Sequence, residues 1–162
     1  IYEIKSENGE NWSVKQMVIF RKNLDERLKK LSAEEKKDNL LTFEQLGVDM
    51  MMVDEAHFFK NCFVFTKLRN VAGITTSSSQ RAFDMLLKCQ YLQETNQGRG
   101  VVFATGTPIS NSISELFVMQ RYLQPQELER FGWSYFDTWI AHFAKRTSVL
   151  ELKPEGYNLV GR

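Results

Sequence analysis

The sequence predicts an α/β fold built on a parallel sheet, because short apolar strands alternate with amphipathic helices along the chain. The segments 48–55 and 101–104 each contain a continuous apolar run, as is typical of strands that are buried on both faces. Segments with helical periodicity precede, separate and follow these two strands. This order is typical of a parallel sheet covered by helices on both faces, so we expect a three-layer domain.

Two helices are predicted before the first strand. The first begins at Ser13 and carries apolar residues at helical spacing as far as Leu31. Ser32 and Glu35 have the spacing of a capping box, which predicts that a second helix starts there, and Gly47 is a plausible end for it. The apolar face of this second helix would comprise Leu40, Leu41, Phe43 and Leu46.

Further helices are predicted after the first strand. The Gly- and hydroxyl-rich segment 73–79 reads as a flexible loop, and a helix follows over 79–95. Another helix begins at Ile113 and ends before Pro125, and a last one begins near Ser134. The side chains expected in the core include Met50, Met51, Met52, Trp133, Phe136, Trp139, Ile140 and Phe143.

Composition excludes several classes of protein. The chain has 162 residues and a formal net charge of +1, so DNA binding would need a local basic patch. No apolar run approaches the length of a membrane span, and no signal peptide opens the chain. Cys62 and Cys89 form no disulfide framework, so we expect reduced, buried thiols and a cytoplasmic protein. We also expect a fragment of a larger protein, because Ile1 is not an initiator and residues 161–162 stop within loop-like sequence.

Chemistry concentrates at the ends of the two predicted strands. Asp54 and Glu55 follow the first strand, at the sheet edge where ligands bind in open α/β folds. Two adjacent carboxylates there suit a Mg²⁺-nucleotide site, although a strand end with two solvated acids explains the pair equally well. The second strand leads into Thr105, Gly106, Thr107 and Pro108, which taken alone is a generic strand-to-helix turn.

Taken together, these motifs resemble the first motor lobe of the Swi/Snf-type branch of the superfamily-two helicase-like ATPases. The match comprises Asp-Glu-Ala-His followed by two residues and Lys-Asn (54–61), the Thr-Gly-Thr-Pro turn with its following Asn (105–111), and a helix running from Glu-Leu to Tyr-Leu-x-Pro (115–125). It covers roughly residues 40 to 146. The resemblance implies a RecA-like lobe over residues 1–146, incomplete at its N-terminus, and a tail over 147–162 that leads towards the next domain.

The resemblance also implies roles for individual residues. Asp54 would hold Mg²⁺ through a water ligand, and Glu55 would orient and deprotonate the water that attacks ATP. His57 would couple the nucleotide state to lobe movement by hydrogen bonding to the turn of Thr105, Gly106 and Thr107. The alternative is that His57 has a purely structural role. Lys60 and Asn61 match the family pattern without an assigned chemistry, and a structural turn explains them as well.

Partners are implied in the same way. They are duplex DNA, a second RecA-like lobe of the same parent chain and, because the chain is also similar to helicase modules of bacterial mobile-element proteins, a DNA methylase domain. Loop residues Thr75, Thr76 and Ser77, together with Arg81, could contact DNA phosphates, or the loop is simply solvated.

One expected part is missing from the sequence. None of the nine glycines is followed by Lys, so the chain has no GxxxxGK[ST] phosphate loop. In the family this loop lies upstream, so ATP and Mg²⁺ would require it, and we expect the chain alone to be inactive. The alternative is a non-catalytic lobe that binds DNA or protein within a larger protein.

Overall fold

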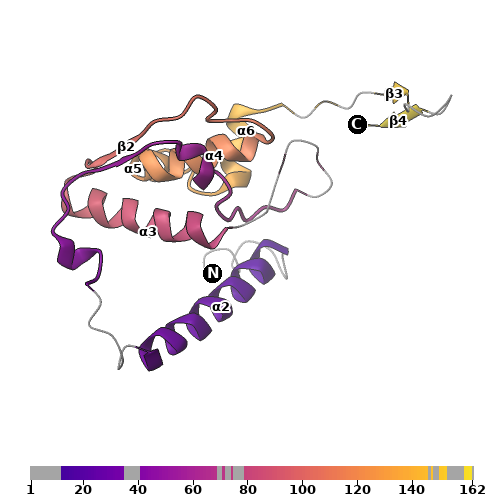
Figure 1. The fold of residues 1–162 in the computed structure, drawn as a ribbon. Helices are drawn as coiled ribbons and strands as arrows, with labels where there is room; N and C mark the ends of the chain where they lie inside the picture. Colours follow the sequence, from indigo (N-terminus) through magenta and orange to yellow (C-terminus); the bar gives the residue numbers. More distant parts are fainter. Residues whose placement is uncertain are drawn as a thin grey trace.

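The computed structural model describes residues 12–34, 41–68, 71, 74, 79–145, 147, 150–152 and 159–161. Figure 1 shows the order of the elements along the chain. The helices are α2 (Trp12–Glu34), α3 (Gln80–Thr95), α4 (Ile113–Leu123), α5 (Pro125–Arg130) and α6 (Phe136–Phe143), with short 3-10 helices η1 (Glu44–Leu46) and η2 (Ala56–Phe59). The strands are β1 (Met51–Val53), β2 (Val101–Phe103), β3 (Leu150–Leu152) and β4 (Leu159–Gly161).

The predicted strands form a two-stranded parallel sheet. β1 pairs with β2 in the register Met51 to Val101 and Val53 to Phe103. The fold is therefore α/β, as predicted, and the strand order β1–β2 with α3 between them is a parallel crossover unit. A second pair, β3 and β4, is antiparallel and was not predicted.

One face of the β1–β2 sheet packs on the core and the other is exposed. Met51, Val101 and Phe103 pack against the buried cluster formed mainly by α3 and α4. The next side chains along the strands point the other way, so Met52 is 74% exposed and Val102 is 43% exposed. In the described residues only one face of the sheet is covered, so the expected three-layer arrangement is not confirmed. Met50 and Met52 are surface residues, and of the three methionines only Met51 packs on the core.

The core lies between α3, α4 and α6 and carries the site-bearing segments. Trp139, Tyr122, Phe136 and Leu92 are among its largest fully buried side chains, so the predicted anchor at Trp139 is confirmed. The Tyr122 hydroxyl group, which is buried, lies 2.7 Å from the Ala82 carbonyl oxygen and 3.0 Å from that of Phe59. Through this one donor, α4 holds both the start of α3 and the end of η2.

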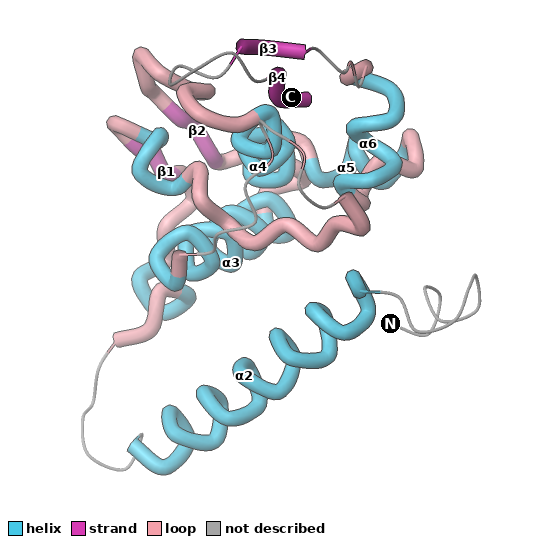
Figure 2. Tube along the Cα trace, turned by 90° about the vertical axis from the view of Figure 1, so that its right-hand side faces the viewer, coloured by secondary structure: helices cyan, strands magenta, loops and turns pink. Residues whose placement is uncertain are grey.

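α2 lies beyond α3, on the side away from the sheet, in both views of the chain (Figures 1 and 2). Its contacts with α3 include the edge-on rings of Phe20 and Phe83, with centroids 5.3 Å apart, and the 3.4 Å ion pair of Arg27 and Asp84. Ser32 lies inside this helix, so the predicted helix start there is wrong. The capping-box spacing also occurs within helices, where the backbone N–H groups already have partners and no cap is needed.

The remaining helix boundaries agree closely with the sequence pattern. The helix predicted over 79–95 is α3, and α4 begins at Ile113 as expected. Pro125 ends α4 but also starts α5, because proline is well suited to the first turn of a helix. Gly47 adopts a left-handed conformation with φ of 64° as the C-cap of η1. Phe143 was expected to be buried but is 48% exposed at the end of α6.

Glycine is required at position 100, in the connection between α3 and β2. Its φ is +97°, and a Cβ atom there would lie 2.7 Å from the Asp49 carbonyl oxygen. The Gly100 carbonyl oxygen accepts the Met51 N–H at 2.8 Å, so this close approach sets where β1 and β2 begin to pair. A side chain at this position would therefore push the two strands apart.

We expect Gly100→Ala to lower the free energy of unfolding by more than the roughly 1–3 kcal/mol typical of a strained backbone residue, because strain and a backbone clash add. Urea unfolding followed by circular dichroism measures the loss. Gly132→Ala is the matched control, since Gly132 also has a positive φ, +71°, but open space around its Cβ position. Equal losses in the two variants would show that the close approach contributes nothing.

Candidate functional site

The parallel pairing of β1 and β2 brings the two sequence motifs together. Hydrogen bonding continues past the strands, since the Ala104 N–H donates to the Val53 carbonyl at 2.9 Å and the Ala56 N–H donates to the Ala104 carbonyl at 3.0 Å. The acidic box (residues 54–57) therefore lies beside the threonine turn (residues 105–108) at the carboxyl ends of both strands. This is the edge at which open α/β sheets bind ligands.

The two carboxylates of the box are exposed, and Glu55 has an unusual backbone. Asp54 Oδ1 accepts the Glu55 N–H at 2.8 Å, which leaves the other carboxylate oxygen available. Glu55 has φ of 51° and ψ of 46°, in the left-handed region that side-chain-bearing residues rarely occupy. Backbone strain of this kind collects at functional sites, so this conformation supports a functional role for the box.

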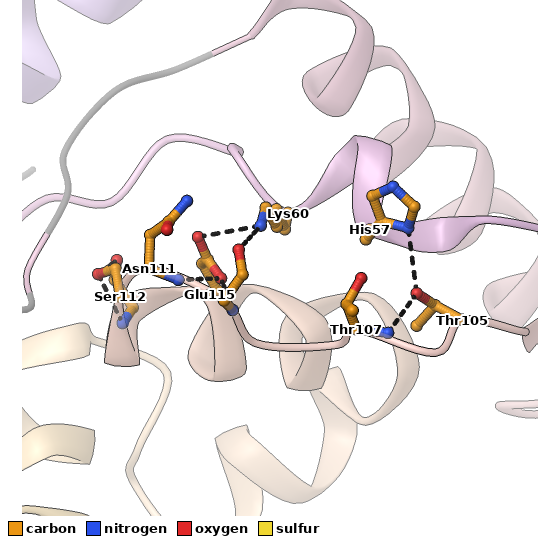
Figure 3. A network of polar contacts seen from close by, with 9 residues as sticks. His57, Lys60, Thr105, Thr107, Asn111, Ser112 and Glu115 are labelled. Carbon is orange, nitrogen blue, oxygen red and sulfur yellow. Dashed lines mark hydrogen bonds and ion pairs between the residues drawn. The ribbon is translucent and has the colours of Figure 1, made fainter.

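His57 connects the box to the turn (Figure 3). Its Nδ1 atom lies 3.2 Å from Thr105 Oγ1 and 3.0 Å from Glu55 Oε2. Thr105 Oγ1 also accepts the Thr107 N–H at 3.2 Å, which closes the turn on itself. With Glu55 ionised, a proton on Nδ1 makes both contacts favourable, because the imidazole N–H then points towards two oxygen acceptors. The imidazole of His57 thus contacts both the Glu55 carboxylate and Thr105 of the threonine turn.

Arg81, at the start of α3, contacts the end of η2. Its guanidinium donates to the Phe58 carbonyl oxygen at 3.3 Å and lies 5.6 Å from the ring centroids of both Phe58 and Phe59. These contacts hold the arginine against η2. The other predicted DNA contacts, Thr75, Thr76 and Ser77, lie outside the described residues.

A second connection between the two motifs was not predicted. The Lys60 ammonium lies 3.4 Å from Glu115 Oε1 and also donates to the Ser110 hydroxyl. Glu115 Oε2 accepts the backbone N–H groups of Ser110 at 2.7 Å and of Asn111 at 3.3 Å. The Ser-x-x-Glu spacing of residues 112–115 marks the start of α4, with Ser112 as its N-cap, but it does not indicate Lys60 as a partner of Glu115.

Electrostatics keep Glu115 ionised. Burial acts to raise the pKa of this carboxyl group, but the N–H groups of Ser110 and Asn111 and the Lys60 ammonium outweigh burial, and the pKa lies below its ordinary value of 4.5. Because the folded-state pKa is lowered, the ionised group stabilises the fold above its ordinary pKa. That contribution is lost as the pH falls through the lowered pKa.

Both cysteines are buried and free, as predicted. Burial raises the pKa of the Cys89 thiol to about 12 and also raises that of Cys62. Both thiols are therefore protonated near neutral pH, which makes them poor nucleophiles and poor metal ligands. They belong to the core rather than to the site.

The site offers oxygen ligands to a cation. Across the segments that the structure describes, no three His, Cys, Asp or Glu side chains gather into a group that could hold a metal ion. One or two exposed carboxylates fit Mg²⁺, which keeps several waters and takes other ligands from phosphates. Asp54, with one oxygen left over from its backbone contact, fits such a limited role.

Among the helices of the described segments, none combines the length and the hydrophobicity of a membrane span.

Comparison with known proteins places this α/β domain among helicase-related domains. The chain belongs to the family described as "Probable helicase domain", whose profile matches residues 1–156. It is also similar to the defense against restriction protein B of Escherichia phage P1, with 32% identity over 114 residues. This alignment covers 68% of the chain but only 5% of that relative. No solved structure matches the chain.

Proposed function

We propose that this chain is part of the first RecA-like lobe of a Swi/Snf-type motor, which couples hydrolysis of Mg-ATP to movement on duplex DNA. The observation that carries the proposal is the contact of His57 with Thr105, which joins an acidic box to a threonine turn across two parallel strand ends. Membership of a helicase-related family supports the same class of protein. Three-layer architecture, ATP and DNA are parts of this proposal.

The three polar residues of the box, Asp54, Glu55 and His57, each have a proposed part in the reaction. Asp54 would hold Mg²⁺ through a water ligand, using its free carboxylate oxygen. The chemistry that Mg²⁺ would supply there is charge neutralisation at the terminal phosphates, which with positioning accounts for most of the catalysis in phosphoryl transfer. Glu55 orients the attacking water and accepts its proton. His57 transmits the change in this site to the threonine turn.

Glu55 contacts His57 through one carboxylate oxygen and has a second oxygen that can act on a water. Its Oε2 atom lies 3.0 Å from His57 Nδ1, so one carboxylate oxygen is already engaged. The side chain is 57% exposed, so it can rotate towards a nucleotide without disturbing the core. His57 retains Thr105 as a partner when Glu55 turns away, which makes the imidazole a relay between the base and the turn.

The proposed motor requires parts that this sequence does not contain. A phosphate loop from another segment would hold the β- and γ-phosphates, and a second lobe would contribute arginines. Duplex DNA and a DNA methylase domain are the further proposed partners. Arg81 and residues 75–77 are the proposed DNA contacts of this lobe, and the chain alone would not hydrolyse ATP.

The longer protein that contains this chain tests the proposal. We expect a GxxxxGK[ST] loop upstream of residue 1, and ATP hydrolysis by the purified protein that rises on addition of duplex DNA. Colorimetric phosphate release with and without duplex measures this rise. Lack of the loop, or of any ATP hydrolysis, would overturn the motor, and hydrolysis indifferent to duplex would point instead to a nucleotide-binding regulator.

A non-catalytic binding lobe is the second candidate. The exposed apolar residues Met50, Met52 and Val102 could carry a protein contact. The similar phage protein is named for defense against restriction, a name that specifies no motor. This candidate predicts binding of DNA or protein by the longer protein without any ATP turnover.

A further inference from the structure

The ion pair between Lys60 and Glu115 differs from the other described ion pairs in its burial. The Lys60 side chain is 13% exposed and that of Glu115 is 4% exposed. In the pair of Arg27 with Asp84 the side chains are 38% and 43% exposed, and the pairs within α2 and α5 are more exposed still. A pair this buried gains less from attraction than it loses by desolvation, unless further hydrogen bonds compensate.

Two further hydrogen bonds of Glu115 serve the segment before the helix. Glu115 Oε2 accepts the backbone N–H groups of Ser110 and Asn111, which precede the N-cap residue Ser112. Its carboxylate therefore fastens the segment that follows the threonine turn.

Lys60 connects this contact to the acidic box. The backbone N–H of Lys60 donates to the His57 carbonyl oxygen at 3.3 Å, so the two residues belong to one turn of backbone. Segment 105–111 is thus attached to segment 57–60 at both ends, by His57 with Thr105 and by Lys60 with Ser110 and Glu115 (Figure 3). Between the attachments, residues 106–109 are exposed, and the Cβ position of Gly106 faces open space.

We propose that Lys60 and Glu115 are positioning residues, whose buried charge pair holds segment 105–111 at the spacing that lets His57 reach Thr105. Neither side chain of the pair contacts Asp54 or Glu55, the residues proposed to act at the nucleotide, in the contacts described above. Its consequence for catalysis rests on the proposed function, whereas its effect on the geometry of the turn is a property of this chain alone. Because segment 105–111 is held at both ends, its exposed middle, residues 106–109, can move while Thr105 stays within reach of His57.

Nuclear magnetic resonance of the 162-residue chain tests the geometry without nucleotide. In Lys60→Met we expect the His57 ring resonances to shift and the amide hydrogens of Ser110 and Asn111 to exchange on the order of tenfold faster, because their acceptor loses its charged partner. In Lys60→Arg, which keeps the charge, both should stay near the wild-type values. Lys67→Met, at an exposed lysine, is the matched control.

The Met and Arg variants separate positioning from packing. Methionine keeps most of the side-chain volume, so a packing role would leave Lys60→Met like the wild type and disturb Lys60→Arg. Unchanged His57 resonances in Lys60→Met would overturn the proposal. If Lys60→Met does not fold, Glu115→Gln removes the same charge pair while keeping a carbonyl oxygen for the two N–H groups, and its His57 resonances decide in the same way.

A kinetic test in the longer protein addresses the consequence for catalysis. We expect Lys60→Met to lower kcat with little change in the KM for ATP, since the lysine orients the turn and does not bind nucleotide. If Lys67→Met changes kcat and KM as much as Lys60→Met does, general destabilisation explains the effect. That result would overturn the proposed consequence for catalysis. Absence of any ATP hydrolysis in the unmodified protein would defeat the proposed function but leave the resonance result to decide the positioning pair.

Discussion

Glu55→Gln is expected to abolish ATP turnover by the longer protein while nucleotide binding persists. Glutamine has the size of glutamate but cannot accept a proton from the attacking water. Loss of a general base typically lowers a rate by about 10²–10⁴-fold. Because Asp54 and the phosphate loop are unchanged, the affinity for Mg-ATP should remain near that of the unmodified protein. Steady-state phosphate release and titration with a fluorescent ATP analogue measure the two quantities separately.

The structure supplies a sharp control for this substitution. Glu94→Gln makes the same chemical change at an exposed position near the C-terminal end of α3, which leads to the amino end of β2 and not to the carboxyl ends that carry the site. Its turnover should equal that of the unmodified protein. Turnover that survives in Glu55→Gln would remove this residue from its assigned part as the base, and loss of nucleotide binding would place it among the binding residues instead.

Trp139→Ala is expected to give the largest loss of stability. The indole is fully buried, its ring centroid lies 4.9–6.0 Å from those of Phe117, Phe136 and Phe143, and its N–H donates to Gln120 Oε1 at 2.6 Å. Replacing a buried tryptophan by alanine costs about 3–5 kcal/mol, since lost burial and the remaining cavity add. For a marginally stable domain, this is a large part of the free energy of unfolding.

Two further variants make the stability measurement decisive. Trp133→Ala removes the same side chain from a half-buried position, so its loss in urea unfolding should be clearly smaller. Trp139→Phe keeps most of the apolar volume and removes only the N–H donor, so it remains measurable if the alanine variant does not fold. Losses of similar size for Trp139→Ala and Trp133→Ala would contradict the assignment of Trp139 as the centre of the core.

Local pattern was sufficient for most of the elements. The helical spacing of residues 79–95 and 113–123, and the turn and proline signals beside them, agree with α3 and α4 because these helices bury one face on the core. The strand ends were also found correctly, within two or three residues. Apolar composition misled where burial depends on neighbours, as with Met52 and Phe143, which are exposed although their types favour the core.

Distant contacts could not be read in this way. Ser32 has the spacing of a helix cap but lies inside α2, because the same spacing also occurs within a continuous helix. Lys60 and Glu115 are 55 positions apart, and neither residue type nor spacing states that they form a buried pair. The left-handed backbone of Glu55 likewise arises from the surroundings, because an ordinary glutamate avoids that region.

The α/β class, the two strand ends and the residue types gathered there could be predicted from the sequence, because they depend on periodicity and on the order of residues along the chain. The tertiary structure decided that His57 reaches Thr105, that Lys60 pairs with Glu115, and that one face of the sheet is exposed. Those features depend on the parallel register of β1 and β2, which pairs residues fifty positions apart, such as Met51 and Val101. Periodicity reports which side of an element is apolar, whereas only packing reports which elements meet it.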